Sequence, residues 1–125
     1  MDINIPEDET VQYAMKLKID AYKHLSDNFD DEIIYKLLET AAVSIDKYLD
    51  RIRKNMILGD IKELLNDYHA LRGMLANLGL EKEAETAGRI QDILKKEDIQ
   101  KVDPLLNDFM IKMINFLIEL RDNSK

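Results

Sequence analysis

The strongest constraint on the fold is a run of apolar residues at helical spacing between Ile33 and Met56. Residues that recur at i, i+3 and i+4 lie on one side of an α-helix. The members of this run are Ile33, Ile34, Leu37, Leu38, Ala41, Ala42, Ile45, Tyr48, Leu49, Ile52 and Met56. The spacing predicts a long amphipathic helix, whose broad apolar face must pack against other helices to leave water.

Similar spacing predicts four further helices, over residues 8–25, 61–78, 81–96 and 104–120. Local signals mark their ends. Gly59 is expected to end the long helix and Gly79 the one after it. Asp60, with Glu63 three residues on, resembles a capping box, and Asp103 followed by Pro104 is typical of a helix start. No segment alternates with period two, so strands are not expected.

The chain has 125 residues, which is one domain's worth of protein. Helices joined by short connections pack antiparallel. We therefore expect one all-α domain over residues 1–125. Residues 1–29 would form an N-terminal helix and connection, and residues 30–120 an antiparallel four-helix bundle.

Composition excludes several classes of protein. The formal net charge of −7 argues against a nucleic-acid partner, because phosphate binding needs clustered Lys and Arg. Without cysteine there is no disulfide, thiolate metal site or cysteine nucleophile. The acidic N-terminus is no signal peptide, and no apolar run approaches the roughly 18 residues of a membrane span. A soluble, cytoplasmic protein is expected, and the initial Met1 favours a free-standing one.

His69 is one of only two histidines, and its helix places it away from the core. With about 100° per residue and His69 at zero, the leucines at 64, 71, 75 and 78 fall between about 180° and 240°. Arg72 then falls near 300°, Gly73 near 40° and Ala76 near 340°. We therefore expect His69 to project into water beside a cation and two small residues.

Gly73 is unfavourable at this position, since a glycine inside a helix lowers its stability by on the order of 1 kcal/mol relative to alanine. On an exposed face it fills no space in the bundle, but it leaves room for another protein to approach the imidazole. The alternative is that an exposed histidine and a tolerated glycine coincide by chance. The spacing alone does not name a reaction.

The stretch HALRGMLANLG, His69 to Gly79, resembles the signature of histidine-containing phosphotransfer (HPt) domains, H-x-L-K-G-(small)-(small)-x-x-L-G. The matching positions are His69, Leu71, Gly73, Leu78 and Gly79. Arg72 stands for the usual lysine and keeps its charge, whereas Met74 and Leu75 occupy the usually small positions. The resemblance covers about residues 30–120.

The resemblance implies a monomeric phosphocarrier of a two-component multistep phosphorelay, not an enzyme. His69 would be the phosphorylation site and Arg72 would stabilise the phosphoryl group. Leu65, Gly73 and Ala76 would dock the partner, which is a response-regulator receiver domain or a hybrid sensor histidine kinase. No cofactor is expected on this chain, because the receiver would supply Mg²⁺ and the reacting aspartate.

Other interpretations stay open. The main alternative is an HPt-like interaction module that binds a signalling partner through the same helix face without being phosphorylated. His24 is best interpreted as a polar residue near a helix C-terminus. A metal site on His24 and His69 lacks the usual ligand spacing, and the three serines match no nucleophile motif.

Overall fold

The computed structural model describes residues 6–96 and 99–122, and the side chains of residues 9–96 and 104–122. Within these residues the chain forms five α-helices and no strand. The helices are α1 (Pro6–Ser26), α2 (Asp31–Leu58), α3 (Ile61–Asn77), α4 (Glu81–Lys95) and α5 (Ile99–Arg121). The prediction of an all-α chain is confirmed over the part of the chain described.

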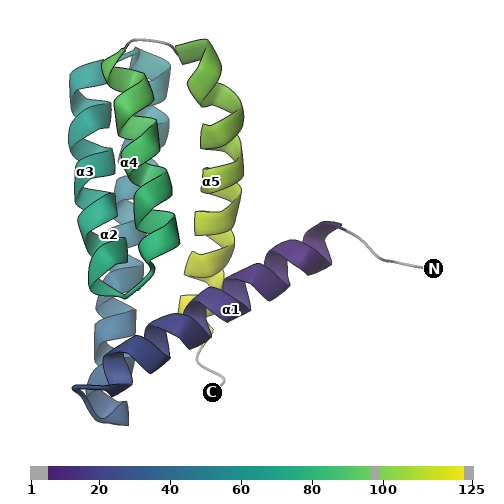
Figure 1. Cartoon of the computed structure of the whole chain (residues 1–125), viewed down its shortest axis with the longest axis vertical. Helices are drawn as coiled ribbons and strands as arrows, with labels where there is room; N and C mark the ends of the chain where they lie inside the picture. Colours follow the sequence, from purple (N-terminus) through teal and green to yellow (C-terminus); the bar gives the residue numbers. More distant parts are fainter. Residues whose placement is uncertain (1–5, 97–98, 123–125) are drawn as a thin grey trace.

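Helices α2 to α5 stand side by side, while α1 lies obliquely across the lower part of the molecule (Figure 1). Short turns join α2 to α3 and α3 to α4 at opposite ends, so each of these neighbours reverses the chain direction. This arrangement is consistent with a helical bundle. It leaves the outer surfaces of α3 and α4 uncovered by α1.

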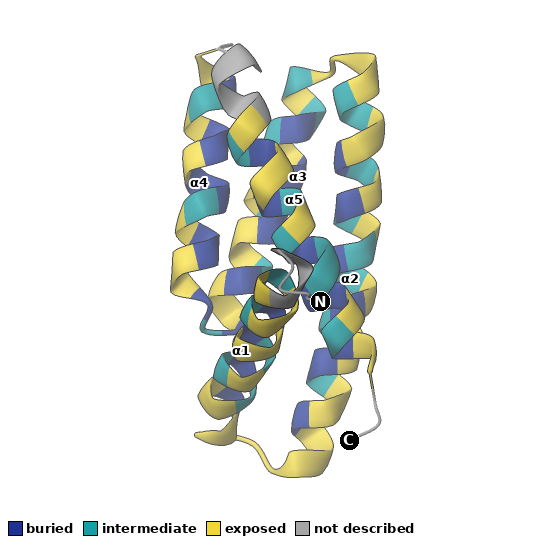
Figure 2. Cartoon of the chain, turned by 90° about the vertical axis from the view of Figure 1, so that its right-hand side faces the viewer, coloured by how far each residue is buried: buried dark blue, intermediate teal, exposed yellow. Residues whose placement is uncertain are grey.

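One hydrophobic core joins all five helices, and Figure 2 shows the buried residues as stripes along them. α2 contributes a buried stripe in the predicted phase: Ile34, Leu38, Ala42, Ile45, Leu49 and Ile52. α1 contributes Leu17, Ala21 and Leu25 to the same core. Periodicity along the sequence therefore identified the inward face of α2, because burial of apolar area is what holds these helices together. The prediction is wrong for Ile33, which is 43% exposed at the edge of the stripe.

The predicted turns at both glycines are confirmed. Gly59 and Gly79 have φ angles of 69° and 78°, a left-handed conformation that residues with a side chain rarely adopt. The Asp60 side chain accepts the backbone N–H of Glu63 at 3.1 Å and caps α3. Glu63 does not complete a reciprocal capping box, because its carboxylate accepts a hydrogen bond from Arg51 instead.

The predicted start of the last helix is wrong. α5 begins at Ile99, and Pro104 lies inside it rather than at its first position. The Asp103 side chain lies outside the described residues, although its backbone is already helical. A proline in the second turn removes only one backbone hydrogen bond. Packing of the rest of α5 can offset that loss, so the local signal marked a start that the fold places earlier.

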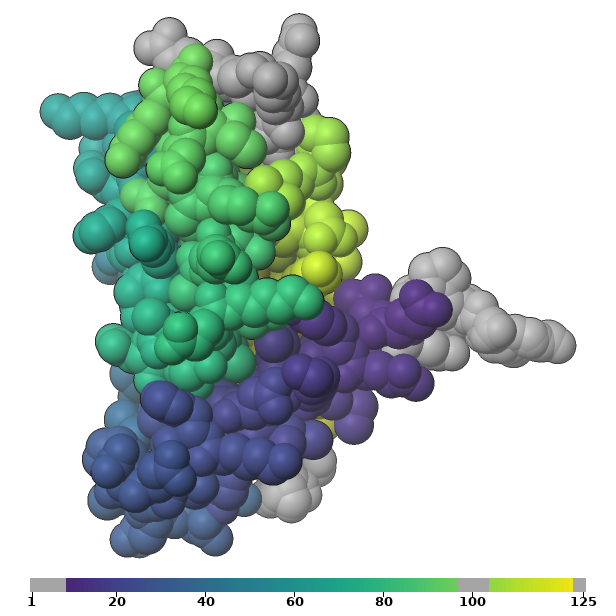
Figure 3. Space-filling view, in the orientation of Figure 1, coloured from purple at the N-terminus to yellow at the C-terminus, as the bar shows by residue number. Residues whose placement is uncertain are grey.

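Helix α1 is attached to its neighbours by polar contacts as well as by the core. The Tyr13 hydroxyl donates to the buried carboxylate of Glu83 in α4, and the Tyr22 hydroxyl donates to Asp31 at the start of α2. The space-filling view shows α1 spread over the lower part of the molecule (Figure 3). Among the helices described, none is both long and apolar enough to cross a membrane.

Candidate functional site

His69 lies on the exposed side of α3, as its position on the helical wheel predicts. The leucines at 64, 71 and 75 on the opposite side are at most 1% exposed. Tyr68, the residue before His69, is completely buried and packs against Phe109 of α5. These contacts hold α3 in one rotational setting, and that setting presents the imidazole to solvent.

The surface next to His69 is open. A Cβ added at Gly73 would meet no atom within 4 Å, so Gly73 is not required for packing within the described part of the chain. Ala76, one turn further on, is exposed, and Leu65, one turn before His69, is half-buried against the core. The structure therefore brings the predicted docking residues onto one face of α3 around the histidine.

Met74 and Leu75, which occupy the usually small positions of the signature, point toward the core and not toward the surface around His69. Leu75 is fully buried, and Met74 is half-buried and packs against the core. Their bulk is therefore directed into the bundle, and the neighbouring exposed face keeps its small residues.

The Arg72 side chain is exposed and leans toward α4, where its guanidinium lies beside Gly88. It makes no hydrogen bond or ion pair with any other residue that the structure describes. A shallow depression adjoins it between α3 and α4, lined by Arg72, Ala76, Glu81, Lys82, Ala84 and Glu85. Arg72 thus retains its hydrogen-bond donors for an incoming anion, next to the exposed histidine in the helix.

A polar cluster fixes the other flank of α3, facing α2. Arg51 Nε donates to Asp67 Oδ1 at 2.7 Å, and Arg51 Nη2 donates to Glu63 Oε1 at 2.9 Å. Asn55 Nδ2 donates to the second oxygen of Asp67 at 2.8 Å. Asp67 is only 1% exposed, and these bonds compensate for its burial. The cluster sets the position of α3 one half-turn before His69.

A second contact links α4 to α3 beneath the histidine. Gln91 is buried, and its Nε2 donates to the backbone carbonyl of Leu65 at 3.3 Å. In an α-helix that carbonyl is also the acceptor for the N–H of residue 69. Gln91 therefore braces the helical turn that carries His69.

The sequence analysis missed Arg51, Asp67 and Gln91. Asp67 did carry a signal, since it falls near 160° on the wheel that places the core leucines at about 180° to 240°. An acid on the apolar side of a helix needs a partner, and a cation on a facing helix could have been sought. Gln91 gave no comparable signal, because its acceptor is a backbone atom.

His24, the other histidine, lies on α1 against Gly79, at the turn between α3 and α4. It is in the last turn of its helix, as predicted, and favourably placed there for a basic group. Over residues whose side chains are described, no three His, Asp or Glu residues cluster in a way that could hold a metal ion.

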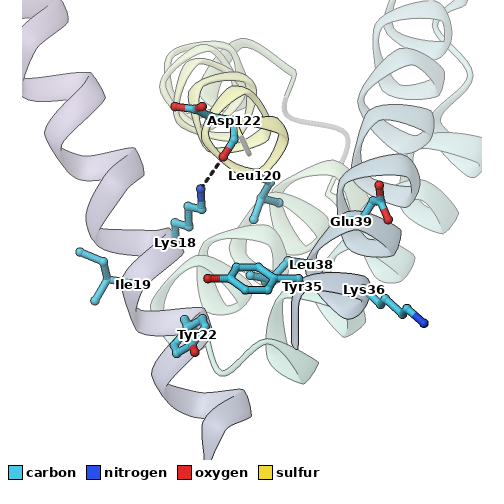
Figure 4. Close-up of a pocket in the computed structure, with 9 residues that line it drawn as sticks. All are labelled: Lys18, Ile19, Tyr22, Tyr35, Lys36, Leu38, Glu39, Leu120 and Asp122. Carbon is cyan, nitrogen blue, oxygen red and sulfur yellow. Dashed lines mark hydrogen bonds between the residues drawn. The ribbon is translucent and has the colours of Figure 1, made fainter. Parts of the chain in front are cut away.

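A separate pocket lies between α1, α2 and the end of α5 (Figure 4). It has a volume of about 450 Å³, with Leu38 and Leu120 on its inner side. Lys18 Nζ crosses it to donate to the backbone carbonyl of Asp122 at 3.0 Å. None of the predicted site residues lines this pocket, so it is separate from the His69 face.

Comparison with known proteins identifies the family of the chain. Neither the curated proteins nor the solved structures include a significant match to the chain. The family model described as the Hpt domain matches residues 36–123, which is well over half of the 125 residues and extends from α2 to the end of α5. The matched segment contains His69 and both flanks of α3. By this match, the chain belongs to the Hpt domain family of phosphotransfer modules.

Proposed function

We propose that this protein is a phosphocarrier in a multistep phosphorelay, and that His69 accepts a phosphoryl group from the aspartate of a receiver domain and returns it. The observation that carries the proposal is the surroundings of His69. An exposed imidazole shares one face of α3 with the open position at Gly73 and with an arginine that has no partner among the described residues.

The chemistry requires little of the carrier itself. A nitrogen of the neutral imidazole attacks phosphorus, forming the P–N bond while the P–O bond to the aspartyl carboxylate breaks. The carboxylate leaves with the electron pair of that bond, and the reverse step restores the aspartyl phosphate. Phosphoryl transfer depends mainly on positioning and charge neutralisation. The partner would supply the aspartate and Mg²⁺.

The neighbours of His69 then have separate roles. Arg72 would donate charge-assisted hydrogen bonds to the phosphoryl oxygens. Leu65 would give the partner an apolar contact, while Gly73 and Ala76 would let its loops come close to the ring. The partners expected are receiver domains or a hybrid sensor histidine kinase, with the protein acting as a monomer in the cytoplasm.

The test is phosphoryl transfer from a phosphorylated receiver domain to the full chain. His69→Gln should abolish labelling, and His24→Gln should leave it unchanged, which provides a matched control on the other histidine. The label should be lost in acid and kept in base, as expected for phosphohistidine. A folded wild-type chain that binds receivers through the α3 face without taking label would instead establish the non-phosphorylated interaction module.

A further inference from the structure

Gly88 is an unexpected residue in the middle of α4. Apart from proline, glycine is the least favourable residue in a helix interior. Gly88 is buried, and its φ is not among the positive values of the chain, so the backbone there would accept any residue. The reason for glycine must therefore be the space that a side chain would occupy.

That space is occupied by Arg72. A Cβ at position 88 would lie 3.2 Å from Arg72 Cζ and 3.4 Å from both Nε and Nη1. The three atoms belong to one planar group and are nearly equidistant from the point where the Cβ would be. The guanidinium therefore lies flat over the α4 backbone, in a shallow seat where the Cβ of any other residue would press on it and force it to shift by a few tenths of an ångström.

The seat limits the freedom of a long side chain. An exposed arginine without a polar partner would otherwise sample many rotamers, and fixing it at the moment of reaction would cost entropy. Here the guanidinium is held on the α4 side of His69, three residues along the same helix, where side chains are neighbours. Its planar face is against α4, which leaves the N–H groups at its edge available to an anion.

We propose that Gly88 is a positioning residue for phosphoryl transfer, acting through Arg72. This inference rests on the proposed phosphocarrier function of His69. It adds that α4 controls where the phosphoryl-stabilising charge lies, although no residue of α4 itself touches the phosphoryl group.

The test is Gly88→Ala in the full chain. Alanine is the better helix former, so the unfolding midpoint should stay the same or rise. The Cβ should displace the guanidinium by a few tenths of an ångström, and the rate constant for transfer at saturating receiver should fall about threefold, as a slightly misplaced group does. Binding of the unphosphorylated receiver should be unchanged. A structural role alone would lower stability and transfer together.

Two controls isolate the route through Arg72. In an Arg72→Ala background, Gly88→Ala should cause no further loss of transfer, because the two residues act as one unit. Thr86→Ala also changes helix propensity in α4, but over the described part of the chain the Thr86 hydroxyl bonds only within its own helix, to the backbone carbonyl of Lys82. Transfer to Thr86→Ala should match the wild type.

Two results would overturn the inference. One is transfer to Gly88→Ala at the wild-type rate or faster. The other is a further loss of transfer when Gly88→Ala is added to Arg72→Ala. Should no variant take label at all, the proposed function fails, and the seat itself is then judged by NMR. The Arg72 Nε–H group should be more ordered than that of exposed Arg53 in the wild type, and should lose that order in Gly88→Ala or Gly88→Ser. Equal mobility in the wild type would show that there is no seat.

Discussion

Two arginines lie on opposite sides of α3, and they differ in the polar partners that the protein gives them. Arg51 reaches α3 from α2 and is bound by Asp67 and Glu63, so two of its three guanidinium nitrogens donate within the protein. Arg72 leaves α3 on the other side, lies against glycine, and has no polar partner among the described residues. The same type of side chain thus joins two helices on one side of α3 and remains available to an anion on the other. The role of a cation near a site is therefore known only when its hydrogen-bond partners are known.

The largest effect is expected on the side of α3 where Arg51 is bound, and it is an effect on stability. Asp67→Ala removes a buried carboxylate that binds both Arg51 and Asn55. We expect the free energy of unfolding to fall by about 2 to 3 kcal/mol. This is less than the roughly 3 to 5 kcal/mol typical of a broken buried pair, because the Arg51 side chain is 41% exposed and can be hydrated. Chemical denaturation measures the change.

Asp50→Ala is the matched control for this prediction, since among the described residues Asp50 pairs only with Lys54 and Arg53, at the surface. It should change stability by less than about 0.5 kcal/mol. Phosphoryl transfer to the folded fraction of Asp67→Ala should remain near the wild-type rate. If transfer were lost while the chain stayed folded, the contact between Arg51 and Asp67 would be needed for transfer as well as for stability.

The next largest effect is expected at Arg72, on the rate of transfer. Arg72→Ala should slow transfer from a phosphorylated receiver about tenfold, which corresponds to about 1.4 kcal/mol of transition-state stabilisation. Stability should be unchanged, because no hydrogen bond or ion pair to a described residue is lost. Arg72→Lys should recover part of the rate, and Arg53→Ala, which removes a distant exposed arginine, should have no effect. A clear loss of stability in Arg72→Ala would contradict the comparison.

A smaller effect is expected between the two flanks, at Tyr68. Its hydroxyl is buried and has no hydrogen-bond partner in the described structure, and burial raises its pKa. Tyr68→Phe removes this uncompensated polar group and keeps the ring packed on Phe109. The free energy of unfolding should rise by about 1 kcal/mol. Exposed Tyr35→Phe is the control and should leave it unchanged, whereas destabilisation by Tyr68→Phe would reveal a partner for the hydroxyl.

The smallest effect appears at high pH. The hydrogen bond that Tyr22 donates to Asp31 raises the pKa of Tyr22 from about 10 to about 12. The folded chain therefore keeps the Tyr22 proton over a range in which the unfolded chain loses it. The stabilisation is complete below pH 10 and is lost as the pH rises toward 12. Arg51 stays charged there, because its hydrogen bond to Asp67 raises its pKa further.

Denaturation at a series of pH values measures this dependence, and phenolate absorbance gives the pKa directly. Tyr22→Phe should make the fall in stability between pH 10 and 12 shallower. An unchanged slope would show that Tyr22 does not hold its proton more tightly in the folded chain.

Local patterns predicted most of the fold. The apolar spacing located the inward faces of the helices, and the glycines at 59 and 79 located two turns, because both signals act within a few residues of the chain. The exposure of His69 followed from the same spacing. The start of α5 was missed because the Asp103–Pro104 signal is also local, and packing along the whole helix outweighed it.

The sequence by itself determined that the chain is helical, that His69 projects outward, and that a glycine and a cation accompany it. Only the tertiary structure decided which arginine is bound and which is available. It also decided that Asp67 is paired and that Gly88 makes room for Arg72. The physical reason is distance along the chain. Helical periodicity fixes the direction of each side chain, whereas its partner comes from another helix whose rotation and height are set by packing of the whole core.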